Sequence, residues 1–319
     1  MNLTGTYIIY QDGKEVARKS NLLTKFGKRF LTSYLAGAVS FTSKDIAIGV
    51  GGSSLEGGTA PSVNNTQLDF EFHRSPVTLG SIDIQTDALT GDSTYSVVYK
   101  TTIANDVVGY ISELGLFNTE SVSGSDYGSR YISSFENNLY WLDSDGLPAN
   151  TESTPTPSIG STWFKIDALS GASSQYTLQT IFDLSGYSVN DSLSLIFKQS
   201  DTNLDYVYIR FYSSSEDYFE GRFVGNSSLN KKVLKVSMSD VYGLNKVGTP
   251  DASSITSIAI GAKAKSSGAT SVLLDGLRVN DEDTFNTNYG LISRSVLDTP
   301  IQKQYGVQTD IEYRIGLTF

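Results

Sequence analysis

The sequence predicts a mainly-β protein in which one helix covers a β-sheet and a β-sandwich is inserted into the sheet domain. Three observations favour this fold class. Apolar side chains recur at steps of three and four across residues 24–35, which is the period of an amphipathic helix. Residues 311–319 alternate between apolar and polar side chains, as half-buried strands do. From residue 162 onward, about eight short strands follow at regular spacing, which is typical of a β-sandwich.

The predicted helix has clear signals at both ends. Thr24 can cap its start, because its hydroxyl can accept a hydrogen bond from an otherwise unpaired backbone N–H. Gly37 can end it, because glycine adopts the left-handed conformation without strain. The apolar period then changes to about two over residues 45–50, so a strand follows. The stripe expected to pack on the sheet consists of Leu23, Phe26, Phe30, Leu31, Tyr34 and Leu35.

The first domain is predicted to be discontinuous. Asp12-Gly13 between two short strands predicts a hairpin over residues 4–20. The strand at 311–319 needs a partner for its backbone groups, and the sheet of the first domain is the obvious one. The first domain therefore comprises residues 1–120 and 286–319. A linker rich in Ser, Gly and Asp is predicted at 118–129.

The inserted domain contains one strongly patterned strand at 205–212. Val207, Ile209 and Phe211 share one face and are predicted to lie in the core. A proline-rich patch at 148–161 is predicted to be a connection before the sandwich strands. These strands are predicted at 162–169, 176–182, 191–198, 205–212, 217–224, 231–238, 255–262 and 270–279.

The opposite face of strand 205–212 is a candidate binding surface. It carries Tyr206, Tyr208, Arg210 and Tyr212, and the next strand adds Tyr218, Glu220 and Arg222. Tyrosine rings beside guanidinium and carboxylate groups suit sugars, which present C–H faces and a rim of hydroxyls. The same composition also suits packing against the first domain or a neighbouring subunit. Both interpretations, a glycan site and a protein interface, remain open at this point.

Composition excludes several classes of function. The net charge is −10, which disfavours nonspecific binding to nucleic acid, since that requires a surplus of Lys and Arg. Cysteine is absent, so thiolate chemistry and a disulfide framework are excluded. No apolar run approaches the roughly 20 residues that span a bilayer, and the N-terminus lacks the pattern of a signal peptide. We therefore expect synthesis in the cytoplasm and no membrane insertion.

Catalysis is not expected. The chain has one histidine, His73, which alternates with Phe72 in a predicted strand. A nucleophile–base pair would have to use this histidine, because no cysteine or second histidine is present. A glycosidase that uses two carboxylates cannot be recognised from sequence, since the required separation of the two acids is spatial. The prediction is a non-enzymatic protein with no required cofactor.

The first domain resembles a recurrent class of tailed-bacteriophage virion proteins. The residues that carry the resemblance are Asn21-Leu22-Leu23, the segments 46–52, 68–71 and Arg74, the segment 111–117, and the closing stretches 291–297, 300–303 and 310–313. The resemblance implies a structural protein of the virion, most simply of the tail or baseplate. Its partners would be other virion proteins and further copies of itself, as a trimer or a higher ring.

The inserted region resembles the jelly-roll fold of carbohydrate-binding modules. Phe135-Glu136 followed by Trp141 is similar to the opening of those modules, and Leu273 to Val279 is similar to their last strand. The resemblance places the insert at residues 130–285. It also implies a structural Ca²⁺ at Glu136 and Asp275. Asp275 shares the parity of the apolar residues of its strand and should point toward the core, where a hydrogen-bonded carboxylate without metal is the alternative.

The sequence thus predicts a virion protein whose β-rich domain holds neighbouring subunits and whose jelly roll projects outward. Two alternatives remain. The first is a head decoration or head-fibre protein. The second is an adhesin that binds a glycan on the host surface through the tyrosine row.

Overall fold

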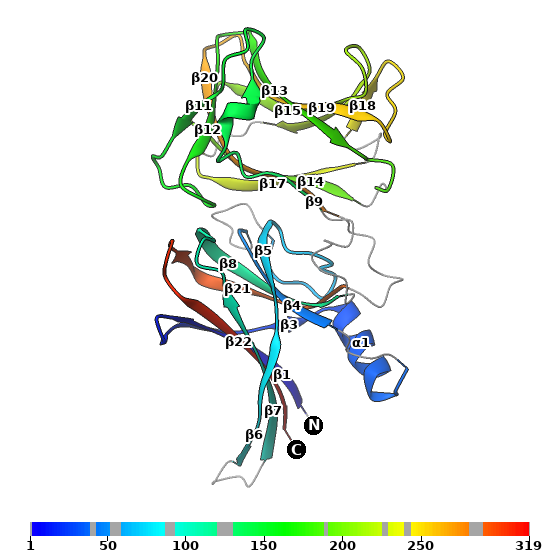
Figure 1. Ribbon diagram of the computed structural model, residues 1–319, viewed down its shortest axis with the longest axis vertical. Coiled ribbons are helices and arrows are strands. Elements are labelled where there is room, and N and C mark those ends of the chain that lie inside the picture. Colours follow the sequence, from blue (N-terminus) through cyan, green and yellow to red (C-terminus); the bar gives the residue numbers. More distant parts are fainter. Residues whose placement is uncertain are drawn as a thin grey trace. The chain divides into compact units, whose positions relative to one another are not determined.

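A computed structural model describes residues 2–38, 43–51, 59–86, 93–119, 130–187, 191–224, 229–238, 244–280 and 290–318. The fold is mainly β, as predicted, and the strands form antiparallel sheets (Figure 1). The described residues up to 119 and from 290 onward form one compact unit, and those from 130 to 280 form another. Within the described residues, no helix is long and apolar enough to cross a membrane.

The first unit consists of two five-stranded sheets and one helix. Its elements are β1 (Asn2–Gln11), β2 (Lys14–Ser20), β3 (Leu22–Leu23), α1 (Lys25–Leu35), β4 (Ser43–Gly49), β5 (Glu71–Pro76), β6 (Thr78–Thr86), β7 (Ser93–Ile103), β8 (Gly109–Thr119), β21 (Gly290–Lys303) and β22 (Thr309–Thr318). Sheet I has the strand order β2-β1-β22-β7-β6, and sheet II has the order β3-β21-β8-β4-β5.

Strand β22 lies in the middle of sheet I. It pairs with β1 along one edge, with Ile9 opposite Ile311, and with β7 along the other, with Tyr99 opposite Tyr313. This confirms that the alternating strand near residue 311 completes the sheet of the first unit. The two sheets share one core, in which the Tyr7 hydroxyl of sheet I lies 2.9 Å from the Ser293 hydroxyl of sheet II.

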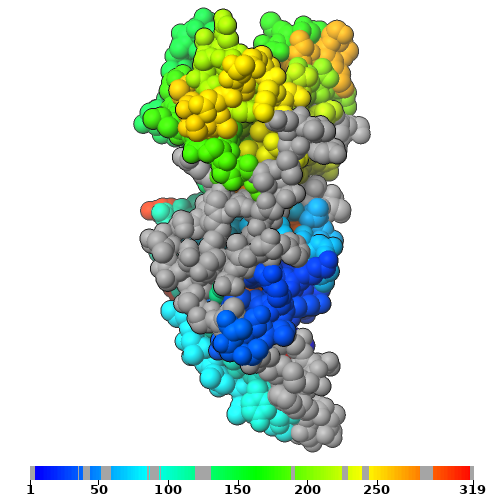
Figure 2. All heavy atoms as spheres, turned by 90° about the vertical axis from the view of Figure 1, so that its right-hand side faces the viewer, coloured from blue at the N-terminus to red at the C-terminus, as the bar shows by residue number. Residues whose placement is uncertain are grey.

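Helix α1 forms as predicted and covers part of this core. The Thr24 hydroxyl accepts a hydrogen bond from the Gly27 N–H at 2.9 Å, and Gly37 has φ +71°. Phe26 and Phe30 are buried, whereas Tyr34, which was expected to pack on the sheet with them, is 45% exposed. The side of the helix away from the core lies at the surface (blue in Figure 2). A Cβ at Gly27 would lie 2.0 Å from the Ile292 carbonyl oxygen, so glycine permits the helix to approach the backbone of β21.

Three residues from the segments that resemble virion proteins, Asp69, Glu113 and Arg294, form a buried ion network. The Arg294 guanidinium donates to Glu113 Oε2 at 3.0 and 2.7 Å and to Asp69 Oδ2 at 2.7 Å. Glu113 Oε1 also accepts from the Phe70 N–H at 3.0 Å, and Asp69 accepts from the Thr59 N–H at 2.7 Å. Burial raises the pKa of Glu113 to about 6, against the opposing effect of Arg294. The motif therefore ties segments of sheet II together.

One end of sheet I presents an apolar surface. Ile82 and Ile84 of the edge strand β6 are 68% and 62% exposed, and Tyr95 of β7 is 44% exposed. They share a face, because Ile82 lies opposite Val97 and Ile84 lies opposite Tyr95. Exposed apolar side chains on an edge strand favour association with another strand.

The second unit is a β-sandwich. Its elements are β9 (Arg130–Ser133), η2 (Asn138–Tyr140), β10 (Trp141–Leu142), β11 (Asn150–Glu152), β12 (Trp163–Ala168), β13 (Ser173–Phe182), β14 (Ser192–Gln199), β15 (Leu204–Tyr212), β16 (Tyr218–Val224), β17 (Lys232–Ser237), β18 (Leu244–Val247), β19 (Ile255–Ala264) and β20 (Thr270–Asn280). Sheet III has the order β10-β13-β19-β15-β16-β18. Sheet IV has the order β11-β12-β20-β14-β17, with β9 paired to β20.

The core between sheets III and IV is rich in aromatic rings. The Phe135 ring lies 5.3 Å from that of Trp141 and 5.0 Å from that of Phe164. Val207, Ile209 and Phe211 of β15 are fully buried, which confirms the predicted inner face of this strand. All eight predicted sandwich strands correspond to observed strands.

Two boundaries differ from the sequence analysis. Asn118 and Thr119 belong to β8 rather than to the predicted linker, because Asn118 pairs with Lys44 and Gly290 on the two sides of that strand. Strand β11 lies inside the proline-rich patch that was predicted to be a connection. The remaining linker residues 120–129 and the return connection at 281–285 lie outside the described residues.

Candidate functional site

The predicted tyrosine row forms a continuous surface on sheet III. Strand β15 lies between β19 and β16, and three residue pairs sit directly opposite each other: Tyr208 and Arg222, Arg210 and Glu220, and Tyr212 and Tyr218. Directly opposite residues of antiparallel strands project from the same side of the sheet. The structure thus brings together the six predicted residues of the face and, between the two arginines, Glu220. We call this set the tyrosine–arginine face: Tyr206, Tyr208, Arg210, Tyr212, Tyr218, Glu220 and Arg222.

Arg210 is fixed at the centre of the tyrosine–arginine face. Its guanidinium carbon lies 4.4 Å from the centre of the Tyr208 ring and 4.7 Å from that of Tyr218. Its Nε donates to Glu220 Oε2 at 2.6 Å, and its Nη1 contacts Gln175 Oε1 and the Tyr212 hydroxyl, both at 3.3 Å. Burial opposes its charge, but the bonds to Tyr212 and Glu220 outweigh burial and raise the pKa of Arg210. This cation is rigid and permanently charged.

Arg222 shares the same carboxylate. Its Nε donates to Glu220 Oε1 at 2.5 Å, and its guanidinium carbon lies 4.6 Å from the centre of the Tyr206 ring. The Arg222 side chain is 48% exposed, whereas Glu220 is buried. Glu220 therefore uses one oxygen for each arginine, so two cations share one anion on this surface.

Tyr208 belongs to the floor of the face rather than to its accessible surface. It was predicted as a contact residue, but it is 3% exposed. The residue opposite it on β19 is Gly261, and a Cβ there would lie 2.3 Å from Tyr208 Cζ, so the ring lies across that strand. Burial raises the pKa of Tyr208 to about 12. Its ring supports Arg210, while Tyr206, Tyr212 and Tyr218 remain half-buried and reachable from solvent.

A polar depression on sheet III lies next to the face. It has a volume of about 360 Å³ and is lined by Asp143, Ser144, Ser173, Ser174, Gln175 and Thr177. Gln175 links it to the face, because its Oε1 contacts Arg210. Sequence reasoning missed this depression, since its residues come from β13 and from the turn after β10, and neither segment carries a distinctive motif. Small residues Ser257, Ala259 and Gly261 of β19 separate the depression from β15.

The two residues predicted to bind a metal, Glu136 and Asp275, accept hydrogen bonds from the loop at residues 158–162. Glu136 Oε1 accepts from the N–H groups of Ser161 and Thr162, both at 3.0 Å. Asp275 is fully buried, as predicted, and its Oδ2 accepts from the N–H groups of Ser158 and Ile159, at 2.5 and 2.9 Å. Burial raises the pKa of Asp275 well above its usual range, against these two hydrogen bonds. The two carboxylates hold residues 158–162 in place.

This arrangement fits a calcium ion poorly. Ca²⁺ takes six to eight oxygen ligands, as a rule. Both oxygens of Glu136 already accept hydrogen bonds, and so does Oδ2 of Asp275. Asp275 Oδ1 is the one atom of the pair that has no hydrogen-bond partner among the described residues. The same part of the chain contains no group of three or more acidic or histidine side chains able to hold a metal. The structural Ca²⁺ stays a prediction from resemblance.

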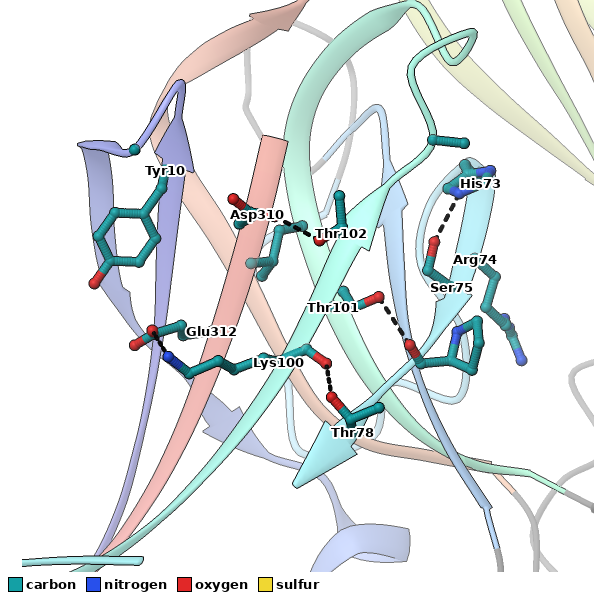
Figure 3. A pocket seen from close by; sticks show the side chains of 14 residues that line it. Tyr10, His73, Arg74, Ser75, Thr78, Lys100, Thr101, Thr102, Asp310 and Glu312 are labelled. Atoms are coloured by element: carbon teal, nitrogen blue, oxygen red, sulfur yellow. Dashed lines mark hydrogen bonds and ion pairs between the residues drawn. The ribbon is translucent and has the colours of Figure 1, made fainter. Parts of the chain in front are cut away.

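A larger cavity, of about 720 Å³, lies in the first unit (Figure 3). Strands β1, β5, β6, β7 and β22 line it. Its polar groups already pair with one another: Lys100 with Glu312 at 2.7 Å, and Thr102 with Asp310 at 2.5 Å. A ligand would have to displace these contacts, so the cavity is a weaker candidate than the tyrosine–arginine face.

The cavity also contains a serine–histidine pair. His73 Nε2 lies 2.8 Å from Ser75 Oγ (Figure 3). Burial lowers the pKa of His73, so the ring is neutral near pH 7. Ser75 is 6% exposed, and no carboxylate is hydrogen-bonded to the other ring nitrogen among the described residues. The pair lacks the third group that orients the base in hydrolase triads. The absence of enzymatic activity remains a prediction.

Comparisons with known proteins give partial structural likenesses. No family model matches this chain, and no curated protein matches it. A family 11 carbohydrate-binding module from Clostridium thermocellum, in complex with a β-1,3-1,4-mixed-linked tetrasaccharide, is 15% identical over 47% of this chain and 94% of its own, with a TM-score of 0.34. A family 30 carbohydrate-binding module is 16% identical over 59% of this chain and 90% of its own, with a TM-score of 0.33.

An exo-β-agarase is 13% identical over 49% of this chain, with a TM-score of 0.35, and the match spans 26% of the agarase. At these scores the likenesses say nothing about what this chain binds. They include carbohydrate-binding modules, which the sequence of the insert resembles. None of these matches supports the resemblance of the first unit to virion proteins, which stays a prediction from sequence.

Proposed function

We propose that the second unit binds a glycan on the tyrosine–arginine face. The observation that carries this proposal is the row of accessible rings, Tyr206, Tyr212 and Tyr218, beside fixed polar groups and a polar depression on the same sheet. Tyrosine rings pack against the C–H faces of sugars, and charged or amide groups bind their hydroxyls. A glycan lying across β16, β15, β19 and β13 would meet both kinds of contact.

The face is organised before a ligand arrives. Glu220 and two rings hold Arg210, and Glu220 and the Tyr206 ring hold Arg222. A preorganised surface loses little conformational entropy on binding, which favours affinity for a small, hydrated ligand.

The alternative is that the same face packs against another protein surface. Tyrosine and arginine are also enriched in interfaces. The virion context remains compatible with either use, because a glycan-binding unit on a particle gains affinity from many copies. A role in the tail or baseplate, a role on the head, and self-assembly into a trimer or ring therefore stay predictions that await their own tests.

The test is retention of purified protein on a panel of immobilised polysaccharides. The double variant Y206A/Y212A removes two accessible rings and should abolish retention. The matched control Y305A removes a tyrosine that is 78% exposed in the first unit and should bind like the wild type. Both variants should keep the wild-type tryptophan fluorescence, because Trp141 and Trp163 lie in the core of the second unit.

Two results would contradict the proposal. One is equal retention of Y206A/Y212A and the wild type. The other is no retention of the wild type together with a change in oligomeric state for the double variant, which would identify the face as an interface. The viscosity of a bound polysaccharide should not fall on incubation with the protein, and a fall would indicate a hydrolase instead.

A further inference from the structure

We infer that the glycan bound by the tyrosine–arginine face carries a carboxylate, as a uronic acid does, and that Arg222 and Arg210 bind it. This inference rests on the glycan-binding role proposed above and adds the chemical class of the ligand. It follows from the charge balance of the face, from the N–H groups left open there, and from the distribution of charge along sheet III.

The charge balance comes from one carboxylate and two guanidinium groups. Arg210 and Arg222 each donate their Nε to a different oxygen of Glu220. The set therefore carries one net positive charge at neutral pH. Lys263 lies opposite Tyr206 on β19 and adds a second positive charge beside it. The chain as a whole has a net charge of −10, so this local excess of cations runs against the general trend of the protein.

Donors remain open after Glu220 is satisfied. No hydrogen bond joins the two terminal nitrogens of Arg222 to any described residue, and the same holds for Nη2 of Arg210. Two tyrosine rings lie against the guanidinium of Arg210 and one ring lies against that of Arg222, so the edges of both groups are the places where N–H donors are presented. The two terminal nitrogens of Arg222 present parallel N–H groups, which match the two oxygens of a carboxylate, and Arg210 adds its Nη2 as a further donor.

The distribution of charged side chains along sheet III also predicts how the glycan is oriented on the face. The two arginines lie on β15 and β16, whereas the polar depression at the β13 side is lined by Asp143 and by neutral hydroxyl and amide groups, with Lys263 of β19 opposite Ser173 at its edge. A carboxylate would be attracted to the first side and repelled by Asp143 at the second. We therefore expect a glycan in which acidic and neutral sugars alternate, with the acid over the arginines and a neutral sugar over Gln175.

The test compares each acidic polysaccharide with its own methyl ester, which keeps the sugar chain and removes the charge. The panel consists of a polymer of alternating glucuronic acid and N-acetylglucosamine, polygalacturonate, a polymer of mannuronate and guluronate, and neutral β-glucan and galactan. At least one acid form should bind, and its ester should bind at least about tenfold more weakly. Added salt should weaken binding of the acid form and leave that of the ester unchanged.

R222Q supplies the residue-level test, with K235Q as its control. Arg222 and Lys235 are both exposed side chains of the second unit, but Lys235 lies on β17 of the other sheet. R222Q should lower affinity for the acid form by about tenfold or more, since a hydrogen bond to a charged group contributes that much. It should lower affinity for the ester by a smaller factor than affinity for the acid form, and it should leave the tryptophan fluorescence unchanged. K235Q should match the wild type in every assay.

The outcomes separate this inference from the proposal on which it rests. Equal binding of acid and ester, or binding of neutral polysaccharides alone, would overturn the carboxylate preference and leave glycan binding in place. An unchanged acid preference in R222Q would overturn the role of the arginines. If no acid, ester or neutral polymer binds, both the preference and the glycan-binding role fail.

Discussion

Replacement of Arg294 by methionine should unfold the first unit far more readily than the second. Arg294 is 1% exposed and contacts Glu113 and Asp69, whose side chains are 0% and 5% exposed. The variant R294M removes the cation that contacts both buried carboxylates. Removing one partner of a buried ion pair costs about 3–5 kcal/mol. Because a domain is stable by about 5–15 kcal/mol, this change should remove roughly a fifth or more of the stability of the first unit.

The loss should depend on pH in a defined direction. Burial already raises the pKa of Glu113 to about 6, and loss of Arg294 should raise it further. A carboxyl group whose pKa is raised in the folded state stabilises the fold below its unfolded pKa, and this stabilisation is lost as the pH rises through the folded pKa. The difference between R294M and the wild type should therefore be largest near pH 7 and shrink toward pH 4.5.

The two tryptophans make the assay selective. Trp141 and Trp163 both lie in the second unit, so tryptophan fluorescence during urea unfolding reports on that unit alone. Far-ultraviolet circular dichroism reports on both. In R294M, part of the dichroism should be lost at lower urea concentration than in the wild type, while the fluorescence transition stays in place.

The triple variant R294M/E113Q/D69N is the matched control. It removes all three charges but keeps oxygens that can accept from the Phe70 and Thr59 N–H groups. It should recover most of the lost stability, because replacing a whole buried ion network by neutral groups is often close to neutral. A loss below about 1 kcal/mol in R294M, or no recovery in the triple variant, would refute the reasoning.

Three further predictions address other parts of the fold. Because burial raises the pKa of Asp275, the melting temperature of the wild type should fall relative to that of D275N as the pH rises from about 4 to 7, and a parallel trend would contradict this. A drop in melting temperature in excess chelator would instead support calcium at this residue. Alanine in place of glycine inside a helix usually stabilises it by about 1 kcal/mol. G27A should instead lower the melting temperature in thermal unfolding, because the new Cβ would clash with the Ile292 carbonyl oxygen. I84S should change the free energy of unfolding by no more than about 0.5 kcal/mol, since this side chain is exposed. It should reduce self-association at high protein concentration, as measured by sedimentation. Unchanged sedimentation would count against association through β6.

The strand pattern was predictable where apolar and polar residues alternate. On β15 this alternation gave the correct inner face, and Thr24 and Gly37 marked the ends of α1. The two-residue strand β10 and the three-residue strand β11 are too short to show a period, and the pairing of β11 with β12 shows why it is a strand.

The sequence was sufficient to predict which side chains belong to the candidate site, but not which of them are buried or how they contact one another. Parity placed Tyr208 on the outer face, yet its burial depends on its register with Gly261, which lies on a strand about 50 residues away in sequence. The partners of Arg294 lie 181 and 225 residues away from it, so no local pattern could connect them. Long-range pairing of this kind is fixed by tertiary structure alone.

The position of β21 and β22 has a consequence for the order of folding. Each is an interior strand of one sheet of the first unit, so neither sheet can be completed before these last strands have been synthesised. The described strands of the second unit end at residue 280, so this unit can fold before β21 and β22 join the first unit. Once it has folded, Arg130 pairs with Val279, which brings the two ends of the insert to adjacent strands. The first unit then closes a short gap instead of a loop of roughly 170 residues between β8 and β21, which lowers the entropy lost on closure. Early folding of the insert should thus accelerate folding of the unit that surrounds it.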